Sequence, residues 1–266
     1  MDLSKAKYIL PNLFTLSSVF AGFYSMIITT RAENARELSV AVWLIVISMV
    51  LDACDGRVAR ATRTESEFGV QLDSLADAVA FGVAPGFLVY HWALEPLGGP
   101  GLFIAFAFIA CGIMRLARFN VLASKGGGTS AHFMGLPIPL AAGTLISVIL
   151  AHLSMTGKLT TNASWSAGLM TVLLSGLMVS GVRYRTFKRV RLRGKAMLII
   201  LALATALVFT SVRYNPGLAF AGILCAYIGL GIFESAVGLG RKRRGLIEEV
   251  LEAADDELSD KVKDLD

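Results

Sequence analysis

Four aspartates, Asp52, Asp55, Asp73 and Asp77, stand within 26 residues of one another and inside apolar runs of the chain. Asp52 and Asp55 are three residues apart, and Asp73 and Asp77 are four apart, so each pair would share one face of a helix. A carboxylate inside a membrane span costs about 2.5–3.5 kcal/mol on insertion scales, so such a cluster indicates a functional site. The pairs stand on consecutive runs joined by a short turn, which predicts that they converge.

The chemistry predicted for this cluster is divalent-metal binding. Two divalent cations would balance four carboxylates that otherwise repel one another. Carboxylate oxygens are ligands that suit Mg²⁺ or Mn²⁺ rather than zinc. The alternative is an ordinary salt-bridge network with Arg57, Arg60 and Arg63. That network would explain neither the spacing of the acids nor the glycines beside them.

Small and polar residues accompany the acids. Gly56 and Gly69 stand beside the two pairs, where a missing side chain lets a helix or a flat ligand approach closely. Asn12 and Thr15 begin the first apolar run, at the depth expected for the acids. There they either contact a diphosphate or the metal ligands, or cap the helix.

Membrane-spanning helices must carry the aspartates. Hydrophobic residues make up 55% of the 266 residues, and the apolar runs have the length of about 20 residues that a helix needs to cross a bilayer. We expect an all-α, polytopic membrane helix bundle, because a membrane-spanning backbone must satisfy its own hydrogen bonds. Eight spans are expected, at residues 12–30, 38–56, 72–92, 100–117, 137–156, 164–182, 195–212 and 217–237.

The distribution of charge predicts the orientation in the cell membrane. With the amino terminus inside, 19 of the 25 basic residues fall on the cytoplasmic side, as the positive-inside rule requires. Both termini and the aspartates are then cytoplasmic. A basic membrane face suits anionic lipids and phosphorylated substrates, and it disfavours nucleic acid because the charge follows the membrane ends. Residues 1–240 are expected to form the transmembrane domain, and residues 241–266 a charged cytoplasmic tail.

The acidic segment itself matches a known signature. Residues 52–77 read DACDGRVARATRTESEFGVQLDSLAD and resemble the CDP-alcohol phosphotransferase (phosphatidyltransferase) family. Its pattern is D, two residues, DG, two residues, AR, eight residues, G, three residues, D, three residues, D. Every fixed position is filled, and a pattern of this length over two spans is far more specific than a short glycine motif.

This resemblance implies a reaction and a set of roles. A nucleotide-activated lipid would bind at the motif, an acceptor alcohol would attack it, and CMP would leave. The four aspartates would hold two metal ions, with Asp77 also acting as the base. The nucleotide site would be shaped by Gly56, Ala59, Arg60 and Gly69. The resemblance also implies a homodimer.

The rest of the chain resembles the phosphatidylserine synthase branch of that family, which implies CDP-diacylglycerol and L-serine as substrates. The supporting stretches are PNLFT at 11–15, FGVAPGFLVY at 81–90, RLARFN at 115–120, GLPIPLAAG at 135–143 and VRYRTFK at 182–188. Ser18 and Gly181 depart from the branch, where asparagine is common. These departures concern the acceptor rather than the reaction class.

An acceptor that carries a carboxylate and an ammonium needs a cation close to the metals. Arg115, Arg118, Arg185 and Lys188 stand at cytoplasmic ends of the expected spans. Arg118, inside RLARFN, is our first choice. Each of the four has an alternative role as a positive-inside anchor.

Two groups of alternatives stay open. Within the family, the acceptor can be glycerol 3-phosphate, inositol phosphate or choline, or the enzyme can be an archaeal ether-lipid version that takes serine. The basic run at 183–195 would suit a phosphorylated acceptor. In another class, a divalent-cation transporter also places acids within the membrane, but near the midplane rather than at the inner face.

Overall fold

Helices make up most of the protein in a computed structural model, which describes residues 3–62, 64, 66–124 and 132–185 and six further residues between 217 and 229. The α-helices are α1 (Leu3–Arg31), α2 (Ala35–Thr62), α3 (Glu67–Asp77), α4 (Ala84–Val89), α5 (Gly99–Ser124), α6 (Ile138–Thr156) and α7 (Ser164–Val179). The remaining elements are the π-helices η1 (Ala78–Val83) and η2 (Tyr90–Leu94), the 3-10 turn η3 (Glu95–Leu97), and the strands β1 (His132–Met134) and β2 (Arg183–Arg185).

The first six expected spans coincide with helical stretches. Five stretches are long and apolar enough to cross a membrane, namely 11–31, 35–62, 67–97, 99–124 and 138–156. The sixth, α7, is apolar but has only 16 residues. The span expected at 195–212 and the tail at 241–266 lie outside the described residues, as does most of the span expected at 217–237. The helical fold class is therefore confirmed, while the number of spans and the sidedness stay predictions.

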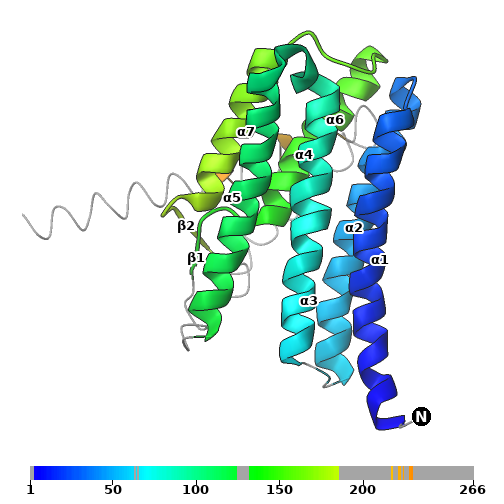
Figure 1. The fold of residues 1–266 in the computed structure, drawn as a ribbon, viewed down its shortest axis with the longest axis vertical. Coiled ribbons are helices and arrows are strands. Elements are labelled where there is room, and N and C mark those ends of the chain that lie inside the picture. Colours follow the sequence, from blue (N-terminus) through cyan, green and yellow to red (C-terminus); the bar gives the residue numbers. More distant parts are fainter. Residues whose placement is uncertain are drawn as a thin grey trace, which may run out of the picture.

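α1 and α2 run antiparallel as a close pair at one side of the bundle (Figure 1). A seam of buried polar contacts joins them. The hydroxyls of Ser18 and Ser48 lie 2.8 Å apart, and Ser25 donates a 2.8 Å hydrogen bond to the carbonyl of Ala41. Hydrogen bonds between helices are a principal source of specificity in membranes, where lipid is as apolar as the core. The seam therefore fixes the register of α2 against α1.

The chain from 67 to 97 forms one helical rod that twice widens from α-helical to π-helical hydrogen bonding, at η1 and at η2. Immediately after Asp77 the rod widens into η1, where the N–H of Ala84 bonds to the carbonyl of Val79. Pro85 follows, and it has no N–H with which to continue the regular helical ladder. Such π-helical segments inside α-helices frequently accompany functional sites. Here the change of pitch lies directly after the last aspartate.

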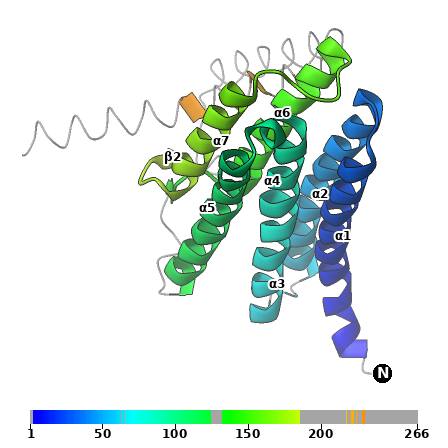
Figure 2. The ribbon, with the colours of Figure 1, turned by 45° about the horizontal axis from the view of Figure 1, so that its top comes forward.

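The core lies where this rod meets α6. Phe81, Leu88, Leu145 and Ile149 are fully buried there, and α6 runs behind the rod (Figures 1 and 2). α5 and α7 cover the side opposite α1 and α2. The helices that carry the aspartates thus lie between α1 on one side and α5 on the other.

An antiparallel pair of three-residue strands, β1 and β2, departs from the all-helical expectation. His132 pairs with Arg185 and Met134 with Arg183. The pairing continues into Gly135, whose N–H bonds to the carbonyl of Val182 at 2.9 Å. Gly135 has a φ of +79°, and a Cβ there would collide with the carbonyl oxygen of Met178. The start of α6 is thereby held against the end of α7.

We expect Gly135→Ala to lower the thermal unfolding midpoint in detergent far more than Gly157→Ala. Both glycines have positive φ, at +79° and +65°, but the position beside Gly157 is open. Gly157→Ala should cost about 1–2 kcal/mol for the left-handed backbone alone. Gly135→Ala should cost a further 1–3 kcal/mol or so for the collision. Equal midpoints for the two variants would contradict the packing of Gly135 against Met178.

Candidate active site

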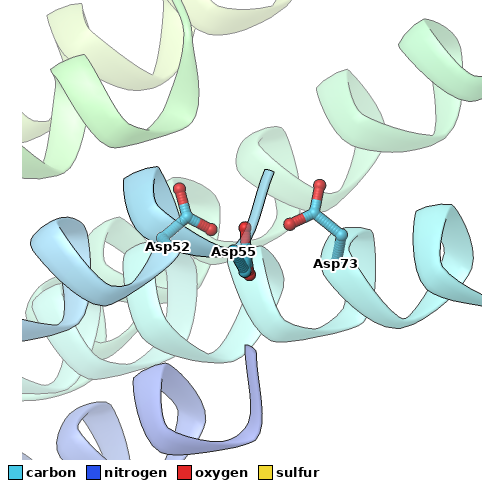
Figure 3. Close-up of side chains that lie close together, drawn as sticks. All are labelled: Asp52, Asp55 and Asp73. Atoms are coloured by element: carbon cyan, nitrogen blue, oxygen red, sulfur yellow. The ribbon is translucent and has the colours of Figure 1, made fainter. Parts of the chain in front are cut away.

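Three carboxylates meet between α2 and α3. One oxygen from each of Asp52, Asp55 and Asp73 lies within 4.8 Å of the others. Figure 3 shows Asp52 and Asp73 extending from the two helices toward a common region, with Asp55 between them. Asp55 is buried, and the other two are half-buried. The convergence predicted from the spacing is found for these three side chains.

A tightly bonded turn sets the two helices beside each other. At the end of α2 the N–H of Thr64 bonds to the carbonyl of Ala59 at 2.9 Å, and the hydroxyls of Thr62 and Thr64 lie 2.7 Å apart. α3 then begins at its N-cap, Ser66, whose side chain accepts the N–H of Gly69 at 3.0 Å. Serine is a favoured N-cap because its oxygen satisfies an N–H at the helix start that lacks an intrahelical partner.

Thr15 on α1 reaches the cluster directly. Its hydroxyl donates a 2.7 Å hydrogen bond to Oδ2 of Asp55 and also lies 3.2 Å from the carbonyl of Pro11. α1 begins at Leu3 rather than at residue 12, so Thr15 and the half-buried Asn12 lie inside the helix. The helix-capping alternative for these two residues is therefore wrong. Thr15 orients one oxygen of Asp55 and leaves the other available.

Asp77 ends α3 at the junction with η1. It is not one of the three acids that converge within 4.8 Å, but its carboxyl lies within hydrogen-bonding reach of Asp52. Its Oδ1 is buried without a hydrogen-bond partner among the described residues. A buried oxygen without a partner is costly. A bound cation or the hydroxyl of a substrate would satisfy it.

The electrostatics of the cluster favour a bound cation. Asp73 is repelled by both Asp52 and Asp55, and at an effective dielectric constant of about 20 two charges about 5 Å apart repel by roughly 3 kcal/mol. Among the described residues, no ion pair joins the four aspartates to Arg57 or Arg60, while Arg63, the third arginine of the salt-bridge alternative, lies outside them. The carboxylate oxygens and the unpartnered Oδ1 of Asp77 fit a hard divalent cation. The arrangement can hold a metal ion.

The residues expected to shape a nucleotide site surround the end of α2. A Cβ at Gly56 would meet only the guanidinium of Arg60, at 3.4 Å, so the arginine lies across the glycine. The same guanidinium is close enough to attract the charge of Asp55. Gly69 is half-buried, and a Cβ there would lie 3.2 Å from the Ser66 hydroxyl. Ala59 contributes its carbonyl to the turn.

The four cations proposed for the acceptor are placed differently. Arg115 on α5 is half-buried, interacts electrostatically with Asp77 and extends over the ring of Phe119, 5.7 Å from its centroid. The side chain of Arg118, one turn later, is exposed. Arg185 belongs to β2, and Lys188 lies outside the described residues. Arg115, on the described part of α5, is a cation whose charge interacts with one of the four aspartates.

Two polar residues that the sequence did not single out, Ser74 and Asn120, lie beside the site. Nδ2 of Asn120 donates to Oγ of Ser74 at 2.9 Å, and that hydroxyl lies 3.2 Å from Oδ1 of Asn120. The available signal was their polarity at helical positions within otherwise apolar spans. Ser18, a departure from the resembled branch, is buried in the α1–α2 seam. Its role there is packing between helices.

With this geometry established, comparison with known proteins identifies the family. The sequence model of the CDP-alcohol phosphatidyltransferase family matches residues 8–180. That range includes the four aspartates, Thr15 and both arginines of α5. The chain belongs to the CDP-alcohol phosphatidyltransferase family.

Individual relatives show which members of the family this chain is similar to. A CDP-diacylglycerol--serine O-phosphatidyltransferase of Helicobacter pylori is 39% identical over 194 residues, which cover 73% of this chain and 79% of the relative. One of the same name from Methanocaldococcus jannaschii is 36% identical over 68% of this chain and 77% of the relative. An archaetidylserine synthase of Methanothermobacter thermautotrophicus is 36% identical over 66% of this chain and 69% of the relative. The chain is similar to serine-using members of the family.

Asp73→Asn should weaken Mn²⁺ binding by the purified protein, because it removes one of the three converging oxygens and a negative charge. We expect a loss of about tenfold or more, at least that of a removed outer-shell partner. Titration followed by the electron paramagnetic resonance of free Mn²⁺ measures this loss without substrate. Glu67→Gln is the matched control, since Glu67 is an exposed acid in the first turn of the same helix. Equal affinities for the two variants would exclude Asp73 as a ligand.

Proposed function

We propose that this protein transfers the phosphatidyl group of CDP-diacylglycerol to the hydroxyl of L-serine and releases CMP. The observation that carries the proposal is the 39% identity to a relative of that printed activity, together with the filled aspartate signature. Family membership also favours a transferase over a cation transporter. Similarity to an archaetidylserine synthase makes an ether-linked CDP-lipid the second candidate donor.

The metal ions belong to this proposal. Asp52, Asp55, Asp73 and Asp77 would hold two Mg²⁺ or Mn²⁺ ions. When bound, such ions neutralise charge on the phosphates and orient the attacking and leaving oxygens. The support from the structure is the set of three converging oxygens and the buried oxygen of Asp77.

Asp77 would act as the general base. The serine hydroxyl oxygen forms a bond to the phosphorus that bears the diacylglycerol, while the bond from that phosphorus to the CMP oxygen breaks. The hydroxyl proton passes to Asp77, and the bonding pair leaves with CMP. Neither Cys nor His occupies a fixed position of the motif, so a single displacement without a covalent enzyme intermediate is favoured. Such a displacement inverts the configuration at phosphorus.

The two substrates would approach the aspartates from different elements. Gly56, Ala59, Arg60 and Gly69, with Asn12 and Thr15, would form the CDP-lipid side. The acceptor side would be formed by α5, where the charge of Arg115 interacts with that of Asp77 and can attract the carboxylate of serine. Arg118, Arg185 and Lys188 stay further candidates for binding the acceptor.

We also propose that the site faces the cytoplasm of a multi-span protein of the cell membrane. The amino terminus, the α2–α3 turn and the end of α5 lie at one end of the bundle (Figure 1). Arg57, Arg60, Arg115 and Arg118 stand toward that end, in agreement with the positive-inside rule. The homodimer and the division into a membrane domain at 1–240 and a tail at 241–266 remain part of the same proposal.

Purified protein supplied with CDP-diacylglycerol and Mg²⁺ or Mn²⁺ should release CMP when L-serine is added. Parallel reactions receive glycerol 3-phosphate, inositol phosphate or choline, and a further set replaces the donor with an ether-linked CDP-lipid. Chromatography of the lipid product identifies the acceptor. If CMP release responded to another alcohol but not to serine, the serine assignment would be wrong, whereas the reaction class would stand.

Asp77→Asn should reduce kcat by about 10²–10⁴, the usual contribution of a general base. Much of the metal-dependent affinity for CDP-diacylglycerol should remain, because Asp77 lies outside the three-acid group. Asp52→Asn is the comparison, and it should lose metal and CDP-lipid binding together. Both variants are examined by binding titration and by turnover. Near-normal turnover by Asp77→Asn would remove this residue from the base role.

A further inference from the structure

The cytoplasm-facing half of α5 carries an amide where its buried stripe predicts an apolar residue. Ala105, Phe108, Gly112 and Leu116 are all buried and recur at helical spacing along one face of α5. The next position on that face is Asn120, which is half-buried. An amide within a membrane helix is costly unless it is hydrogen-bonded. The described partner of its side chain is Ser74 on α3.

Ser74 occupies a sensitive position on the rod. It follows Asp73 directly and precedes Asp77 by three residues, so it lies within one helical turn of both acids. Its hydroxyl accepts from Nδ2 of Asn120 at 2.9 Å and donates toward Oδ1 at 3.2 Å. We call this pair the Ser74–Asn120 bridge. It connects the helix of the arginines to the helix of the second acidic pair.

The Ser74–Asn120 bridge lies where α3 and α5 are no longer packed closely through apolar side chains. In both views, α5 lies beside α4 and diverges from α3 toward the end of the bundle that carries the α2–α3 turn (Figures 1 and 2). Val70, one turn before Ser74 on the same face of α3, is 54% exposed, so no helix of the described residues encloses it. The spacing of α5 from α3 at this depth therefore depends on the bridge more than on side-chain packing.

That spacing determines the surroundings of Asp77. Arg115 stands five residues before Asn120 on the same helix, and its charge interacts with that of Asp77. On the side of Arg115 toward the start of α5, the helix is fixed by close packing, since a Cβ at Gly112 would run into the side chain of Ile138. On the side of Arg115 toward the end of α5, the Ser74–Asn120 bridge is a polar connection to α3. Arg115 is thus held between one packed contact and one hydrogen-bonded contact.

We propose that Asn120 is a positioning residue for the acceptor: through Ser74 it holds α5 at the distance at which the charge of Arg115 acts on Asp77. This inference rests on the proposed function and deepens it on the acceptor side. The amide acts through another residue and does not itself touch the substrate. Its loss should weaken acceptor binding selectively, because the CDP-lipid side is formed by α1, α2 and the start of α3.

The test is a double-mutant cycle with Asn120→Leu, Ser74→Ala and the double variant. Each single variant should raise the KM for serine about three- to tenfold, the range that one or two interhelical hydrogen bonds in a membrane supply. The KM for CDP-diacylglycerol and the affinity for Mn²⁺ should change less than about twofold. The double variant should be no worse than either single variant, because both remove the same contact. Ser124→Ala is the control, since Ser124 at the end of α5 is exposed and its described hydrogen bond goes to the carbonyl of Val121 on the same helix.

Three results would overturn the proposal. One is an unchanged KM for serine in both single variants. Another is an increase with Asn120→Leu but not with Ser74→Ala, which would mean that the amide contacts the acceptor directly. The third is a fully additive double variant. If Asn120→Leu does not fold, Ser74→Ala and its effect on the two KM values decide alone.

The result of this double-mutant cycle can be distinguished from the result of the test of the proposed function. If the wild-type protein uses another alcohol instead of serine, the function proposal fails, and the same cycle is measured with that alcohol. The bridge acts on the distance between Arg115 and Asp77 and therefore on any acceptor that binds there. A selective and non-additive rise in the acceptor KM would then still support the bridge.

Discussion

The crowding of carboxylates inside membrane spans is the physical constraint on which the rest of this structure depends, because the neighbouring elements must hold groups together that repel one another. Asp52, Asp55 and Asp73 place oxygens within 4.8 Å of one another, and Asp77 adds a buried oxygen without a described partner. Apolar surroundings make the repulsion stronger and the lost hydration costlier. A divalent cation would relieve both costs, and the same cation would supply positive charge for phosphoryl transfer.

The neighbouring elements hold the acids in spite of that repulsion. Thr15 fixes one oxygen of Asp55, and the serine seam below it fixes α1 against α2. The bonded turn from Ala59 to Ser66 sets α3 antiparallel to α2, and the π-helix η1 begins at the residue after Asp77. α5 then supplies Arg115 as a cation beside the cluster. The hydrogen bonds of Thr15, of the serine seam and of the turn are directional polar contacts, which lipid cannot replace.

The sequence predicted the helical architecture and the acidic cluster because both depend on short-range patterns. Apolar runs of about 20 residues give the spans, and intervals of three and four give shared helix faces. Contacts between distant segments leave no such pattern. The bond from Thr15 to Asp55 spans 40 residues and that from Ser74 to Asn120 spans 46, so a single sequence does not reveal either partner. For the same reason, the pairing of β1 with β2 and the electrostatic interaction of Arg115 with Asp77 required the structure.

The most direct test of the metal centre is anomalous diffraction from crystals of the protein grown with Mn²⁺ and CDP-diacylglycerol. Two manganese peaks are expected between α2 and α3, with oxygens of Asp52, Asp55, Asp73 and Asp77 at about 2.0–2.2 Å, the short coordination distance of a small hard cation. Crystals of Asp73→Asn should lose at least one peak. An ordered CDP-lipid at the aspartates with no manganese beside it would contradict the metal centre.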